Sequence, residues 1–436
     1  MPKLSLRRLK PVLSGWPTLL CAFALLAGSA VTAGEALAVA DPARSSAVRT
    51  LSYHGYQIDV PTSWRVVDLT ARPHACLRFD QPAVYLGPAG DQTRCPSHVI
   101  GGAPGLHLEP LDQRSGAQLT RSTVLASQQG AVRAGRLPHH GPVTIAVPSA
   151  GVVTTAVYGQ RSAATARRIL EHGRVLATAQ PKLPTSLPTR HTSPGEGISA
   201  PGTYVGRGFD ACTAPSQAAM DAWRASTKYR SVGVYIGGVS RGCAQPNLTA
   251  AWVARQARSG WHSIPTYVGR QAPCTRFFNR ISFDPRTARV QGRVEGRDAV
   301  ARATDLGIAA PSTLYSDIEG YDNTNSACVA AVLGYVSGWT HALHAHGYRA
   351  GVYSSAASGI RDLSASHTTP GYNAPDQIWL AWWNGVANVD GGSYLPDTQW
   401  SKRQRIHQYA GNVPERHGGY RIAIDRDFLD VSPGQP

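Results

Sequence analysis

Two acids lie two residues apart in LYSDIEGYD, residues 314–322, a segment that otherwise has the apolar character of a buried strand. Asp317 and Glu319 occupy positions i and i+2, so on an extended strand their side chains point to the same side. Unpaired carboxylates are costly to bury, and a strand of this kind usually places Val, Ile or Leu there. The two acids therefore either pair with bases inside a core or line a cleft.

Further acids end two other strand-like segments. Asp210 ends TYVGRGFD, and Asp425 lies with Asp427 in IAIDRDFL near the end of the chain. Carboxylates that share a cleft push their pKa values apart, so one can stay protonated while another is ionised. Hydrolysis of a glycosidic bond needs such a pair, because one acid protonates the leaving oxygen and a carboxylate stabilises positive charge or activates water. The predicted catalytic residues are Glu319, Asp317, Asp210 and Asp425.

Aromatic residues gather at the same strand ends. Rings beside carboxylates suit a glycan cleft, because the C–H faces of sugars stack on them. Aromatic side chains in strands are also ordinary core residues, so each position has two possible roles. The predicted substrate-binding residues are Tyr235, Tyr267, Tyr321, Tyr353, Trp382 and Tyr409.

The region 203–436 alternates strand-like and helix-like segments. Eight strand-like segments, mostly separated by helical patterns, indicate a parallel sheet. The number of repeats predicts an α/β fold, a (β/α)8 TIM-like barrel, whose active site would lie at the C-terminal ends of the strands. A doubly wound open sheet is the alternative, but this region has no G-x-G-x-x-G turn and no P-loop lysine.

The first 40 residues have the features of an export signal. A basic start and an apolar middle are followed by Ala38-Val39-Ala40, which predicts a signal peptide cleaved after Ala40. An uncleaved anchor helix is one alternative, and twin-arginine export through Arg7-Arg8 is another. We therefore expect a protein that is secreted or associated with the cell wall.

Two further parts lie between the signal and the barrel. Residues 41–180 contain short alternating segments and one amphipathic helix, which predict a small α+β accessory domain of unknown role. Residues 181–202 are rich in Pro, Ser and Thr and lack a hydrophobic period, which predicts an exposed linker.

Cysteine usage agrees with export. Removing Cys21 with the signal leaves six cysteines, and an even number in an exported chain predicts disulfides. Cys76 and Cys95 lie in the accessory domain and most simply pair with each other, although sequence does not fix connectivity. The candidates are Cys76, Cys95, Cys212, Cys243, Cys274 and Cys328.

The net charge and the remaining motifs reduce the number of possible partners and reaction types. The formal net charge is +16, and a diffuse positive field suits anionic surfaces such as cell-wall polymers better than nucleic acid. A high-GC codon bias toward Arg and Ala would produce a similar composition. His341, His344 and His346 have no acid or cysteine that completes a metal set, and the serines of GVYSSAASG do not stand in a G-x-S-x-G elbow. We expect a monomer without metal or organic cofactor.

Six segments of the barrel region resemble the actinobacterial secreted glycoside-hydrolase-like domain (domain of unknown function 1906), which is similar to the family 25 muramidases. They are GFDACTAPS, VGVYIGG, IPTYVG, YSDIEGY, SGWTHALHAHGYRAGVYSS and IDRDFLD. The resemblance covers most of 203–433 and none of the accessory domain. It implies a flattened barrel with a site for peptidoglycan-type glycans. By position, Glu319 matches the general acid, Asp317 its partner carboxylate, Asp210 the first-strand acid and Asp425 the acid near the last strand.

The sequence leaves three functions open. The first is a secreted hydrolase of peptidoglycan or a related wall polysaccharide, acting by carboxylate acid/base catalysis. The second is a non-catalytic protein that binds wall glycan through a retained cleft. The third is a structural domain whose acids pair with Arg207 or Arg426. A bell-shaped pH profile of turnover would distinguish the enzyme from a binding module.

Overall fold

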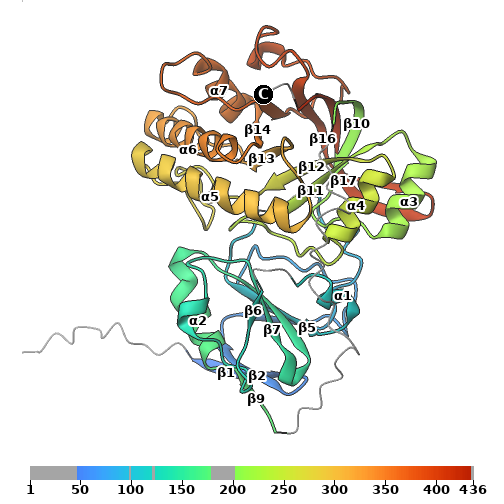
Figure 1. Ribbon diagram of the computed structural model, residues 1–436, viewed down its shortest axis with the longest axis vertical. Coiled ribbons are helices and arrows are strands. Elements are labelled where there is room, and N and C mark those ends of the chain that lie inside the picture. Colours follow the sequence, from blue (N-terminus) through green and yellow to red (C-terminus); the bar gives the residue numbers. More distant parts are fainter. Residues whose placement is uncertain (1–46, 98–99, 120–122, 178–201, 434–436) are drawn as a thin grey trace, which may run out of the picture. The chain divides into compact units, whose positions relative to one another are not determined.

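A computed structural model describes residues 47–97, 100–119, 123–177 and 202–433 (Figure 1). The predicted signal peptide and all but one residue of the predicted linker lie outside these ranges. The described residues all fall in one compact unit. Within them, no helix is both long enough and apolar enough to span a bilayer.

The amino-terminal part, up to residue 177, contains two sheets and two α-helices among its described residues. A three-stranded antiparallel sheet has the order β1 (Val48–Tyr53), β2 (Tyr56–Pro61), β9 (Arg174–Val175). A six-stranded mixed sheet has the order β3 (Arg65–Asp68), β4 (Ala83–Leu86), β5 (Gly105–Pro110), β8 (Val152–Val157), β7 (Val143–Val147), β6 (Val124–Leu125). The helices are α1 (Gln113–Gly116) and α2 (Ala163–Glu171). Buried residues of α2 share a core with these strands.

The carboxyl-terminal part is a closed barrel of eight strands, which confirms the predicted α/β architecture. In order around the barrel, the strands are β10 (Tyr204–Asp210), β11 (Ser231–Gly237), β12 (His262–Tyr267), β13 (Thr313–Asp317), β14 (Arg349–Ser355), β15 (Gln377–Ala381), β16 (Gln404–His417) and β17 (Tyr420–Val431). The helices that follow the first five strands are α3 (Gln217–Ser226), α4 (Ala250–Arg258), α5 (Pro285–Asp305), α6 (Ser326–His344) and α7 (Arg361–Ala365).

The last strand departs from the regular (β/α)8 pattern. No helix separates β16 from β17, and the two strands form an antiparallel hairpin. The turn uses Gly418 and Gly419 at φ values of 54° and 88°, a region that glycine adopts without steric cost. β17 then closes the barrel by pairing antiparallel with β10, and this register sets Asp425 directly opposite Asp210.

Polar residues start the helices, and small residues pack two of them closely. Asn325 caps α6 by accepting a hydrogen bond from the backbone N–H of Cys328, and Asp284 caps α5 through Thr287. The helices α5 and α6 lie side by side in Figure 1. A Cβ at Gly292 of α5 would lie 2.0 Å from the carbonyl oxygen of Tyr335, so only glycine permits this approach.

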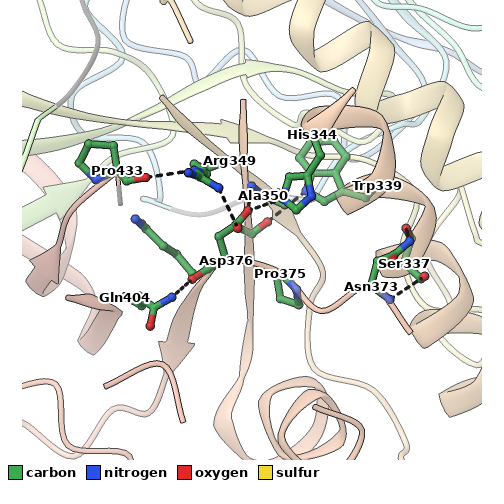
Figure 2. A network of polar contacts seen from close by, with 12 residues as sticks. Ser337, Trp339, His344, Arg349, Ala350, Asn373, Pro375, Asp376, Gln404 and Pro433 are labelled. Atoms are coloured by element: carbon green, nitrogen blue, oxygen red, sulfur yellow. Dashed lines mark hydrogen bonds and ion pairs between the residues drawn. The ribbon is translucent and has the colours of Figure 1, made fainter. Parts of the chain in front are cut away.

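A polar network fastens the amino-terminal ends of three parallel strands, opposite the end where an active site is expected (Figure 2). Asp376, just before β15, accepts hydrogen bonds from the backbone N–H of Ala350 and from Nε2 of His344, both at 2.7 Å. Its own carbonyl oxygen accepts from Nε2 of Gln404 at 2.8 Å. Asp376 therefore ties α6, β14 and β16 together, and His344 has a structural partner.

Candidate active site

Asp210 and Asp425 form the floor of the carboxylate cluster. Both are buried, and they are cross-strand neighbours where β10 meets β17. Oδ1 of Asp425 accepts hydrogen bonds from the backbone N–H of Asn412 and from Oγ of Ser97. Oδ1 of Asp210 accepts from the hydroxyl of Tyr235 at 2.8 Å. Donors of this kind stabilise the ionised form of a carboxylate.

Gln408 of β16 links these two acids to the aromatic residues above them. Its Nε2 donates to Oδ2 of Asp210 at 3.1 Å and to Oδ2 of Asp425 at 3.3 Å. Its Oε1 accepts from the hydroxyl of Tyr353 and from Nε1 of Trp383, both at 3.0 Å. The amide thus uses both N–H groups and both lone pairs inside a buried network.

Asp427 is a third acid beside this pair, and its surroundings favour the protonated form. It is buried, and Nε1 of Trp379 donates to its Oδ1 at 3.0 Å. Burial, together with the negative charges of Asp210 and Asp425, raises the pKa of Asp427 well above its usual range. We therefore expect Asp427 to hold its proton when its neighbours are ionised.

Asp317 and Glu319 are positioned by the amide of Gln271. Asp317 is the last residue of β13, and Glu319 lies just beyond the strand. Gln271 donates from Nε2 to the carbonyl oxygen of Asp317 at 2.9 Å and accepts at Oε1 from the N–H of Glu319 at 2.8 Å. Ile318, between the two acids, packs in the cluster that contains residues of α6, so it faces the helices.

Two buried tyrosines lie close to these carboxylates. Burial raises the pKa of Tyr353 well above its usual value, and so do the negative charges of Glu319, Asp317, Asp210 and Asp425. The pKa of Tyr235 is raised in the same direction by burial and by Asp210, Asp317 and Asp425. The structure therefore brings the four predicted catalytic acids, from β10, β13 and β17, around two predicted substrate-binding tyrosines.

Glu319 reaches an open pocket of about 350 Å³, whereas Asp210, Asp317 and Asp425 are buried. The pocket is also lined by Tyr353, Trp382, Trp383 and Tyr394. Trp382 and Tyr394 meet edge to face at 5.5 Å, and Trp383 exposes 63% of its surface. A second pocket of about 640 Å³ shares Ser355 and Ala357 with the first, so the groove continues past Glu319.

Three of the predicted substrate-binding tyrosines lie elsewhere. The hydroxyl of Tyr267 donates to Asp298 of α5, and that of Tyr321 donates to Asp362 of α7, at 2.8 and 2.6 Å. Tyr321 still borders the second pocket. Tyr409 lines a different pocket together with Arg207 and Arg426.

Sequence reasoning missed several residues of the site. Gln408, Gln271 and Ser97 are uncharged polar residues without a motif, and only their partners reveal their role. Tyr394 follows an irregular segment after β15 and was not identified either. Arg426, which the sequence suggested as a partner for the acids, forms an ion pair with Glu415 at 2.6 Å.

Disulfides hold the loops around the site. The structure confirms the expected pair Cys76–Cys95 and adds two within the barrel region, Cys212–Cys243 and Cys274–Cys328. Cys212 follows β10, and Cys274 lies in the loop after β12. Across the described ranges, no group of three or more His, Cys, Asp or Glu side chains is arranged to hold a metal ion.

Comparison with known proteins finds one family match, in the barrel region. Residues 221–429 match the family described as "Rv2525c-like, glycoside hydrolase-like domain". No curated protein matches the chain.

Solved structures resemble about half of the chain. The Tat-secreted protein Rv2525c of Mycobacterium tuberculosis, in complex with L-tartrate, is 12% identical over 52% of this chain and 96% of its own, with a TM-score of 0.35. An uncharacterized protein of B. stearothermophilus is 18% identical over 51% of this chain and 95% of its own, with a TM-score of 0.33. The modular autolysin LytC of Streptococcus pneumoniae is 12% identical over 48% of this chain and 42% of its own, with a TM-score of 0.30.

Proposed function

Because residues 221–429 match the family described as "Rv2525c-like, glycoside hydrolase-like domain", we propose that the protein hydrolyses peptidoglycan or a related cell-wall polysaccharide. The observation that carries the proposal is the position of Glu319. It lies in an open aromatic pocket, and its charge acts on Tyr353 together with those of three buried carboxylates. A half-buried acid that lines a pocket beside fully buried carboxylates suits a proton donor that works beside a stabilised negative charge.

The roles follow from burial and from hydrogen bonding. Glu319 would protonate the glycosidic oxygen, because among the four acids it is the one in the pocket. Asp317 lies on the same strand end and would stabilise the positive charge that develops on the sugar or position water. Asp210 and Asp425 would keep the floor of the site negative, since each accepts several hydrogen bonds. Trp382 and Trp383 would stack on sugar faces.

The substrate and the place of action are also part of the proposal. A strongly basic protein would be held near anionic wall polymers by its diffuse positive field. The six paired cysteines fit an oxidising, extracytoplasmic environment. We therefore infer that the protein is exported and works at the cell wall as a monomer.

A second candidate is a non-catalytic wall-binding protein. Burial of Asp210, Asp317 and Asp425 favours it, because a bound glycan in this conformation would touch only Glu319 among the acids. The aromatic pocket would then grip sugar without cleaving it.

One experiment separates the two candidates. Reducing ends released from purified peptidoglycan are measured for the wild-type protein, for Glu319→Gln and for the control Glu171→Gln, which makes the same change at the end of α2. A hydrolase requires activity in the wild type and the control and a loss of about 100-fold or more in Glu319→Gln. Activity that survives in Glu319→Gln would assign the proton donor elsewhere. If none of the three releases sugar and all sediment with the polymer, the protein is a binding module.

A further inference from the structure

We propose that the accessory domain completes the active site, with Ser97 as a positioning residue for Asp425. Ser97 is buried, and its Oγ donates a hydrogen bond to Oδ1 of Asp425. The proposal rests on the proposed function, because Asp425 belongs to the same carboxylate cluster. It assigns a role to a domain that the family match does not cover.

The loop that carries Ser97 is held in place by contacts within the accessory domain. Cys76 and Cys95 close it with a disulfide two residues before Ser97. Inside the loop, the buried side chain of Gln92 accepts from the N–H of Leu77 at 2.8 Å and donates to the carbonyl oxygen of Ala75 at 3.1 Å. Ser97 is therefore anchored to the accessory domain independently of the barrel.

The same loop is fastened to the closing strand of the barrel. The carbonyl oxygen of Thr93 accepts a hydrogen bond from the N–H of Ala423 at 2.9 Å. Ala423 lies on β17 two residues before Asp425. Two contacts, one through the backbone and one through a side chain, thus fix the accessory loop against the strand that carries the acid.

Two other segments of the accessory domain, at Phe79 and Gly101, pack closely against the loop that follows β11. The N–H of Gly101 donates to the carbonyl oxygen of Ser240, and the N–H of Phe79 donates to that of Gly242, both at 2.8 Å. A Cβ on Gly101 would lie 2.5 Å from Cα of Gly242. Because the disulfide Cys212–Cys243 holds this loop, the accessory domain docks on a fixed part of the barrel.

The contact matters electrostatically because Asp425 is surrounded by other acids. Its charge acts on Tyr235 of β11 and Tyr353 of β14 together with those of Asp210 and Asp317, and Glu319 adds to the effect on Tyr353. It also acts on Asp427 of β17, together with Asp210. A hydroxyl that donates to Asp425 stabilises its negative charge without adding a positive one. Removing that donor makes the charged form less favourable, so the cluster should take up a proton at a higher pH.

The test compares Ser97→Ala, Ser97→Thr and the control Ser52→Ala, which lies exposed on β1, in the full chain with its disulfides intact. Melting temperature is measured between pH 4 and pH 7. We expect Ser97→Ala to melt about 4 °C below the wild type at pH 7 and the difference to shrink toward the acid end of the range, since a hydrogen bond to a charged acceptor is stronger than one to a neutral carboxyl. Ser97→Thr keeps the hydroxyl and should restore the wild-type behaviour.

An equal loss at both pH values in Ser97→Ala would overturn the proposal, because it would show that Ser97 only fills space. Failure of Ser97→Thr to restore the pH dependence would overturn it as well. The pH–rate profile adds an independent measurement if the wild type is active: the acid limb of Ser97→Ala should move to higher pH. An inactive wild type refutes the proposed hydrolysis while the melting data still decide the role of Ser97.

Discussion

Replacing Gln408 with Met should remove four buried hydrogen bonds while keeping a side chain of similar length. Two of these bonds end on the acids Asp210 and Asp425, and two come from Tyr353 and Trp383. A hydrogen bond to a charged group contributes about 1.5–3 kcal/mol and a neutral one about 0.5–1.5 kcal/mol. Because the contributions within one network are not additive and protonation can relieve part of the loss, we expect a net cost of about 3–5 kcal/mol in the free energy of unfolding.

Gln404→Met is the matched control. Gln404 starts the same strand, and its side chain makes one neutral hydrogen bond, to the carbonyl oxygen of Asp376. We expect that variant to cost about 1 kcal/mol. Both are measured by guanidinium unfolding followed by tryptophan fluorescence, with disulfides intact and with the slope compared to the wild type. If Gln408→Met costs no more than Gln404→Met, the network does not hold the acids in the way described.

Two further changes test the protonation of the cluster and the opposite end of the barrel. Asp427→Asn should raise the melting temperature near pH 7 and have little effect near pH 4. An acid whose folded-state pKa is raised loses stability as the pH rises above its unfolded value of about 3.9, whereas the amide keeps the acceptor for Trp379. A lower melting temperature near pH 7 would show that the charged form is needed. Asp376→Asn should weaken the contacts with His344 and Ala350 and cost about 1–2 kcal/mol in denaturant unfolding. Under the proposed function its sedimentation with peptidoglycan should equal that of the wild type, and a difference would mean that the two ends of the barrel are coupled.

The sequence contained enough information for the barrel and its acids. Strand and helix periods alternate from Tyr204 onward, and carboxylates end or follow apolar strands, where unpaired burial would be costly. Because side chains alternate along a strand, Asp317 and Glu319 were expected to point to one side, and Ile318 between them packs on the other side, against residues of α6.

The same reasoning could not predict what the amides and hydroxyls do. Gln408 and Tyr409 are adjacent on β16, so their side chains face opposite sides of the strand. The sequence analysis predicted Tyr409 as a substrate-binding residue, but it is Gln408 that faces the acids. Ser97 has no periodic or charge signal, because its partner lies 328 residues away in the sequence. The hairpin of β16 and β17 was also hidden, since a strand pattern does not reveal whether its neighbour runs parallel or antiparallel.

The antiparallel seam between β10 and β17 has a consequence for how the protein reaches its working state. Asp210 and Gln408, which share a hydrogen bond, are 198 residues apart in the sequence. Contacts between distant segments form slowly, because the loop-closure entropy must be overcome before they contribute stability. The first and last strands of the barrel therefore meet late in folding, and their meeting assembles the carboxylate floor. A chain synthesised only as far as Tyr394 would carry Glu319 and the aromatic residues of its pocket but neither Gln408 nor Asp425, so the carboxylate cluster would be complete only after β16 and β17 have been added.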